Sequence, residues 1–222
     1  VIVQPEERKE LIIGELKKAA SEVSGYVLPD DELLEIVTFL VEYPVAICGS
    51  FSKDFLALPR EVLISAMREH QRYFSLTDAA GSLLPYFVAI SNTRPKNPNV
   101  VARGNERVLQ ARLSDANFFF LEDRKVPLIH RLEGLKRVIY HSKLGTSYEK
   151  VMRISNLAKY LTERIDPSLQ ETVRRASFLC KCDLITGMVG EFPSLQGVMG
   201  RIYALLSGEK EEVALPICEH YL

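Results

Sequence analysis

The spacing of apolar residues changes along this chain, and the change limits the folds open to it. Residues 72–76 and 83–91 are β-prone, and Asp78-Ala79-Ala80-Gly81 between them has the composition of a hairpin turn. The proline- and asparagine-rich segment 92–99 predicts a loop. From about Val100 to the end, apolar residues recur at helical spacing. The pattern therefore indicates strands followed by a long helical stretch.

Further elements are expected before the hairpin. Apolar residues at helical spacing predict helices at 5–24, 31–43 and 59–71, and Val45–Cys48 predicts a short buried strand. We therefore predict an α+β fold class with two portions. Residues 1–125 form a mixed portion with a β-hairpin and a basic loop and helix, and residues 126–222 form an all-α portion.

Composition excludes several classes of protein. Apolar residues make up 47% of the chain and charged residues 26%, which excludes a disordered or collagen-like chain. No apolar run is long enough for a transmembrane helix, and no signal peptide opens the chain. Four cysteines do not make a disulfide framework. We therefore expect a cytoplasmic protein that does not bind membranes.

The net charge of -1 conceals an uneven distribution of charge. Residues 94–160 hold fourteen basic and six acidic residues, whereas residues 1–50 hold four basic and ten acidic ones. A basic middle can attract a polyanion, because nearby charges matter more than the total within a Debye length. A solvated surface with chance clustering explains the same pattern, and composition does not separate the two.

The basic middle contains a loop and a helix suited to phosphate contacts. On a helix over 102–125, Leu109 and Leu113 lie on one face, and Arg107 points about 200° away from Leu109 at about 100° per residue. Guanidinium groups bind phosphate oxygens bidentately. The candidate cations on this loop and helix are Arg94, Lys96, Arg103, Arg107 and Arg112. The alternative is a helix surface laced with ion pairs, with Glu106 as the local partner.

A second candidate group joins the third predicted helix to the hairpin. Arg72 and Tyr73 are adjacent, and arginine and aromatic side chains stack on unpaired nucleobases. In the competing interpretation, the nearby His70 contacts the terminal helix carbonyls or packs, as a lone histidine at a helix end usually does. Both interpretations stay open on sequence.

No motif for catalysis or metal binding is present. Cys180 and Cys182 form a C-x-C without a second pair, whereas a closed zinc site needs four ligands. The chain lacks a nucleophile elbow, a phosphate-binding loop and a dinucleotide fingerprint. We therefore expect no catalytic residue, no metal and no cofactor within this chain.

Six strings in chain order are distinctive. They are REHQRYF (68–74), LLPYFVAISN (83–92), GNERVLQARLSDANFFFLEDRK (104–125), LGTSYEK (144–150), KCDLITGMVGEF (181–192) and LQGVMG (195–200). Together they closely resemble the β subunit of bacterial glycyl-tRNA synthetase. The resemblance covers most of residues 55–222 and weakens over residues 1–50.

The resemblance implies a function and partners. In this family the β subunit takes part in tRNA recognition and aminoacylation, and a separate α subunit uses ATP and Mg to form the adenylate. The family's β chain is much longer, so we expect a middle piece whose helical portion is cut short. The resemblance thus implies a bacterial cytoplasmic ligase subunit that contacts glycine tRNA and the α subunit. It implies no complete active site in this chain.

The rear portion in this family is similar to the HD superfamily of helical phosphohydrolases. The resemblance places Cys182-Asp183 where active members have a metal-binding histidine–aspartate pair, and His141 at an upstream histidine. A site without one central ligand holds metal and activates water poorly. We therefore expect an inactive, degenerate HD-like scaffold. The alternatives are a metal-dependent phosphohydrolase and a purely structural module that contacts other subunits.

Overall fold

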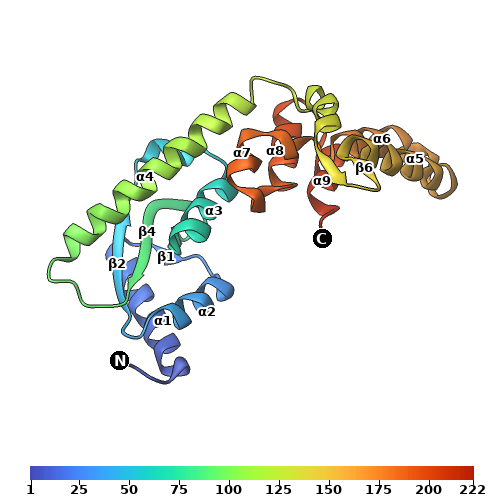
Figure 1. Ribbon diagram of the computed structural model, residues 1–222. Coiled ribbons are helices and arrows are strands. Elements are labelled where there is room, and N and C mark those ends of the chain that lie inside the picture. The colour runs from blue at the N-terminus through green and yellow to red at the C-terminus, as the bar shows by residue number, and fades with distance from the viewer. The chain divides into compact units, whose positions relative to one another are not determined.

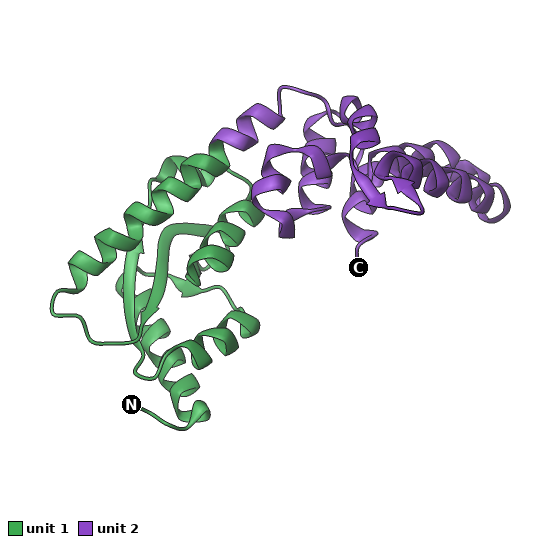
Figure 2. Ribbon diagram, viewed as in Figure 1, with its two compact units in different colours: residues 1–117 green, residues 118–222 purple.

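The computed structural model describes all 222 residues, which form two compact units, residues 1–117 and residues 118–222 (Figure 2). Helix α4 (Pro98–Asp123) passes through the boundary, which lies ahead of the change of character expected near residue 125. The α+β class is confirmed, because helices predominate and a small antiparallel sheet is present. None of the helices combines the length and apolar character needed to span a membrane.

Four antiparallel strands form the sheet of the first unit, in the order β1-β3-β4-β2 (Figure 1). The strands are β1 (Tyr26–Val27), β2 (Val45–Ser50), β3 (Phe74–Thr77) and β4 (Leu83–Ser91). The predicted hairpin is confirmed as β3 and β4. Its turn closes because Asp78 Oδ1 accepts hydrogen bonds from the N–H groups of Ala80 and Ser82, both at 2.9 Å.

The predicted helices of the first unit are present. They are α1 (Pro5–Glu22), α2 (Asp31–Leu40) and α3 (Arg60–Gln71), with a 3₁₀ turn, η1 (Lys53–Ala57), before α3. Pro5 occupies the first turn of α1, where its missing N–H costs nothing. Asp30 caps α2 by accepting a hydrogen bond from the N–H of Leu33 at 2.8 Å. Local sequence therefore determines where these helices begin.

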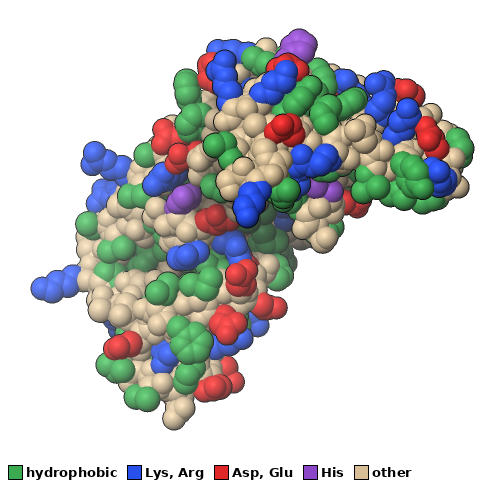
Figure 3. Space-filling view, turned by 45° about the vertical axis from the view of Figure 1, so that its right-hand side comes forward, with side chains coloured by type: hydrophobic (Ala, Val, Ile, Leu, Met, Phe, Trp, Pro, Cys, Tyr) green, Lys and Arg blue, Asp and Glu red, His purple; other side chains and the backbone are tan.

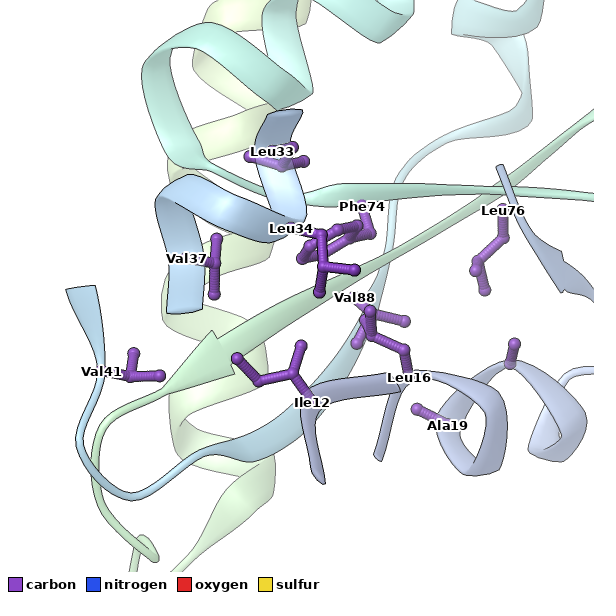
Figure 4. Packing of buried hydrophobic residues seen from close by; sticks show 11 residues of the cluster. Ile12, Leu16, Ala19, Leu33, Leu34, Val37, Val41, Phe74, Leu76 and Val88 are labelled. Carbon is purple, nitrogen blue, oxygen red and sulfur yellow. The ribbon is translucent and has the colours of Figure 1, made fainter. Parts of the chain in front are cut away.

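The core of the first unit lies between the sheet and two helices (Figure 4). Ile12 and Leu16 of α1 and Leu34 of α2 pack against Phe74 of β3 and Val88 of β4. Each such side chain is less than a tenth exposed, so each contributes about 1.5–3 kcal/mol by burial. Residues that alternate with Val88 along β4 face the other side of the sheet. Helix α3 contacts β3 and β4, and a hydrogen bond from Ser50 to Glu106 joins the end of β2 to α4.

The second unit is mainly helical. After the end of α4 its α-helices are α5 (Ser147–Ile165), α6 (Gln170–Leu179), α7 (Gly187–Glu191), α8 (Val198–Leu206) and α9 (Glu211–Glu219). Its 3₁₀ segments are η2 (Leu128–Arg137), η3 (Pro167–Leu169), η4 (Cys182–Ile185) and η5 (Pro193–Leu195). The predicted helical character is therefore largely present, and prolines begin two of the 3₁₀ segments.

The prediction that this portion is all-α is wrong in one place. Strands β5 (Ile139–His141) and β6 (Gly145–Thr146) form a two-stranded antiparallel hairpin. Gly145 has a φ of +83°, which a glycine adopts without a steric penalty, and the backbone turns back there. Thr146 then caps α5 in a capping box with Glu149. The hairpin therefore ends where the helix begins.

Candidate nucleic-acid interface

Helix α4 presents two arginines to solvent. Arg103 and Arg107 are exposed and lie one turn apart, beside a shallow depression that Ser50, Ser52 and Gln110 also line. The opposite face of α4 is buried, as predicted, through Leu109, Leu113, Ala116 and Phe120. The helix is therefore held by its apolar face while its cations stay accessible.

Glu106, the expected partner of these arginines, is engaged elsewhere. One of its carboxylate oxygens, Oε1, accepts hydrogen bonds from the backbone N–H of Ser50 at 2.8 Å and from the Ser50 hydroxyl at 3.0 Å. Neither Arg103 nor Arg107 makes an ion pair. Glu106 thus ties α4 to the end of β2 and leaves both guanidinium groups available for an external anion.

The other predicted cations lie in different surroundings. Arg94 and Lys96 are exposed on the loop between β4 and α4, and Arg94 lines a separate depression of about 460 Å³ that Lys18 also lines. The loop is anchored, because Asn92 Oδ1 accepts hydrogen bonds from the N–H groups of Glu42 and Tyr43. Arg112 is half-buried on α4. The cations therefore do not all share one hollow.

The structure corrects the expectation for Tyr73. Its ring is 6% exposed and stacks on Phe87, with 4.5 Å between centroids and 15° between planes. Burial also raises the pKa of the Tyr73 hydroxyl. The ring is therefore engaged in packing rather than presented to solvent for a base to stack on. Its neighbour Arg72 is exposed and adopts a left-handed conformation with a φ of 56°.

On the face that Figure 3 shows, cations do not form one continuous field. Figure 3 shows Lys and Arg side chains interspersed with acidic and hydrophobic ones over the visible face. An anion is therefore attracted by particular unpaired cations rather than by the total charge. Arg103 and Arg107 are predictable from the sequence, whereas the hydrogen bond between Glu106 and Ser50 is not. Nothing in the sequence indicates that pairing, because the two residues lie 56 positions apart.

Asp183, one of the positions that the HD resemblance singles out, is fully buried and caps a helix. Its Oδ2 accepts hydrogen bonds from the backbone N–H groups of Gly197, at 2.5 Å, and Gly200, at 3.2 Å, at the start of α8. Oδ1 has no hydrogen-bond partner. Burial raises the pKa of Asp183 to about 6, against the lowering effect of these hydrogen bonds.

The other two positions that the HD resemblance singles out, Cys182 and His141, lie in different surroundings. Cys182 is fully buried, its Sγ donates to the Phe178 carbonyl at 3.2 Å, and burial raises its pKa to about 12. The thiol is therefore protonated at neutral pH. His141 is exposed on β5, and its Nδ1 accepts a hydrogen bond from the N–H of Lys143 at 3.1 Å. No group of three or more histidine, cysteine, aspartate or glutamate side chains is placed to hold a metal ion.

Comparison with known proteins covers the whole chain. The family model described as glycyl-tRNA synthetase beta subunit matches residues 1–222, including residues 1–50, where the resemblance had been weakest. The glycine–tRNA ligase beta subunits of Geotalea daltonii, Citrifermentans bemidjiense and Syntrophus aciditrophicus are 60%, 59% and 58% identical to it over 222 residues. Each match covers 100% of this chain and 32% of the relative. The chain thus spans about a third of the length of these relatives.

Proposed function

This chain belongs to the glycyl-tRNA synthetase β-subunit family, and on that premise we propose that it contributes a tRNA-binding surface to a glycine–tRNA ligase. The complete enzyme attaches glycine to its tRNA at the expense of ATP. The ATP, Mg and adenylate chemistry belongs to the α subunit, so residues 1–222 supply binding and assembly rather than catalysis.

One observation carries this proposal: the exposed arginine pair on α4 lacks an internal partner. Oε1 of Glu106, the nearest acid in sequence, is bound to Ser50, and Arg103 and Arg107 are exposed without an ion pair, so both guanidinium groups can donate to external phosphates. Each phosphate that a cation neutralises releases condensed counterions, which makes the affinity fall as salt rises. The proposal therefore predicts a measurable salt dependence.

The test is a salt titration of glycine tRNA binding. We expect Arg103→Gln/Arg107→Gln to weaken binding and to lower the slope of log affinity against log salt by about 2, or about 1 for each cation. Lys9→Gln/Lys17→Gln is the matched control, because it removes two exposed cations from helix α1 in the acidic front segment. Equal slopes for the arginine variant and the unmodified chain would refute the proposal.

We also propose that the chain contacts the family's α subunit, because large apolar side chains on the first unit are exposed. Phe39, at the end of α2, is 67% exposed, and Tyr43 is 46% exposed. Exposed aromatic residues are enriched at protein interfaces. Phe39→Ser/Tyr43→Ser is expected to weaken association with the α subunit while tRNA binding stays unchanged. Unchanged association, measured by analytical ultracentrifugation, would remove this surface from the assembly.

For the second unit we propose a helical scaffold of the HD type that has no hydrolytic role. The support is that Asp183 Oδ2 accepts hydrogen bonds from the backbone N–H groups at the start of α8, while Cys182 is a buried thiol. The phosphohydrolase alternative is not favoured. Phosphomonoester turnover that depends on added Mn²⁺ and disappears in Asp183→Asn would revive it.

A further inference from the structure

A cavity of about 330 Å³ opens on the first unit, bounded by α2, β2, β4, α4 and the junction between α3 and β3. Its walls are mostly apolar and include Val41, Ile47 and Ala89. The volume lies at the lower end of the range of about 300–1,000 Å³ that is typical of ligand pockets. The cavity is therefore large enough for a small ligand.

Three polar side chains that line this cavity have no hydrogen-bond partner within the protein. They are the amides of Gln71 and Asn105 and the hydroxyl of Tyr73, whose side chain is more than nine-tenths buried. Gln71 and Asn105 are partly exposed, and solvent reaches the polar atoms of all three side chains, so each can form a hydrogen bond with a ligand in the cavity. The other hydroxyl at the cavity differs, because Ser91 Oγ already donates to the Thr93 carbonyl at 3.0 Å. A ligand with a polar edge would satisfy the three unpaired groups.

Arg72 supplies the only charge among the residues that line the cavity. It follows α3 in a left-handed conformation, with its N–H bonded to the Arg68 carbonyl and the N–H of Tyr73 bonded to the Met67 carbonyl. This helix-ending motif strongly prefers glycine at the left-handed position. An arginine there bears a backbone cost, which its packing does not explain because the side chain is exposed.

The cavity thus combines apolar walls, two amides, one hydroxyl and one cation. A nucleobase matches this set, because its faces are apolar and its edge carries donors and acceptors that asparagine and glutamine amides can pair with. The adjoining phosphate matches the guanidinium. A lipid tail would leave the amides unpaired, and a cationic ligand would be repelled by Arg72.

We propose that this cavity receives one unpaired nucleotide of the bound tRNA, with the base between the apolar walls and its phosphate beside Arg72. The inference rests on the proposed tRNA-binding function. Asn105 lies about 200° around α4 from both Arg103 and Arg107, at 100° per residue. The cavity and the arginine pair therefore flank α4 on different sides, and an RNA strand that crosses the helix reaches both.

The first experiment removes the unpaired polar groups. Asn105→Ala and Tyr73→Phe are each expected to weaken glycine tRNA binding about threefold to tenfold, as loss of one hydrogen bond does. Asn156→Ala, an exposed asparagine on α5, is the control and keeps full affinity. Far-UV circular dichroism verifies that each variant is folded. Full affinity in both cavity variants overturns the inference.

The second experiment uses the left-handed arginine. Arg72→Gly is expected to raise Tm by about 2–4 °C, because glycine adopts the left-handed conformation without the backbone cost. It is also expected to weaken tRNA binding and to lower the slope of log affinity against log salt by about 1, because one cation is lost. Ser24→Gly is the matched control, since Ser24 has the same conformation with a φ of 55°. It raises Tm and leaves binding unchanged. An Arg72→Gly variant with full tRNA affinity overturns the inference.

A third experiment separates a tRNA nucleotide from a free one. Nucleoside 5′-monophosphates are titrated into the chain, and micromolar binding that Asn105→Ala abolishes overturns the tRNA nucleotide as the occupant in favour of a free nucleotide. The same variants distinguish failure of the proposed tRNA-binding function from failure of the cavity assignment. If Arg103→Gln/Arg107→Gln weakens tRNA binding but the cavity variants do not, the cavity assignment alone is wrong.

Discussion

Asp183 gives a sharp test of how this fold tolerates a buried carboxylate. Its pKa rises from 3.8 to about 6 because burial disfavours the charged form. A tenfold change in proton affinity is worth about 1.4 kcal/mol, so the ionised group costs the folded state about 3 kcal/mol. Because the folded pKa is raised, protonated Asp183 makes the free energy of unfolding higher by this amount. The contribution is fully present below pH 3.8 and is lost as pH rises through about 6.

Asp183→Asn removes this pH dependence while keeping an oxygen for the N–H groups of Gly197 and Gly200. We expect the free energy of unfolding of the variant, relative to the unmodified chain, to rise by about 2 kcal/mol between pH 4 and pH 7, because part of the change already lies below pH 4. Urea unfolding at four or five pH values measures the difference. Taking differences between the two chains cancels the titration of all other groups.

Asp166→Asn is the control with the opposite sign. Asp166 is at the surface, and hydrogen bonds from Ser168 hold the pKa of its carboxyl below the usual value. Its contribution is present above the unfolded pKa and is lost as pH falls, so Asp166→Asn loses stability relative to the unmodified chain as pH rises. A relative stability of Asp183→Asn that is the same at every pH would refute the reasoning.

Two further predictions concern packing, both measured by urea unfolding. Asp123 accepts hydrogen bonds from the N–H groups of Gly187 and Met188 and from the Tyr203 hydroxyl, at 2.9–3.0 Å. Asp123→Ala is therefore expected to lower the free energy of unfolding by about 3–5 kcal/mol. A decrease of less than about 1 kcal/mol, the net value of one hydrogen bond, would contradict this. Gly49→Ala would place its Cβ 2.5 Å from the Phe87 ring and is expected to lower the free energy of unfolding by about 1–3 kcal/mol. Gly14→Ala meets no atom within 4 Å and is expected to raise it by about 0.5–1 kcal/mol. Equal effects of the two substitutions would show that the Phe87 ring moves aside at no cost.

Much of the fold follows from local sequence. Pro5 and Asp30 begin helices where predicted, and the side chain of Asp78 closes the predicted hairpin turn. The apolar face of α4 through Leu109 and Leu113 is likewise as expected. These features depend on residues within a few positions of each other, so the sequence pattern contains the information needed to predict them.

The β5–β6 hairpin was missed because its signals are short. Its strands span three and two residues, too few for an alternating pattern to stand out from the helical segments around it. Gly145 was the available signal, since its positive φ permits the reversal. A single glycine between helical stretches is more often a helix end, and for that reason it does not predict a hairpin.

The amino-acid sequence alone determined the helices, the main hairpin, the family and the two arginines on α4. Only the tertiary structure decided which partners these residues take: Glu106 binds Ser50, 56 positions away, and the Tyr73 ring packs on Phe87. It also brought together the cavity, whose walls come from five parts of the chain. The physical reason is that helix and turn signals act through neighbouring residues, whereas a side chain's partner depends on how its helix lies across the sheet.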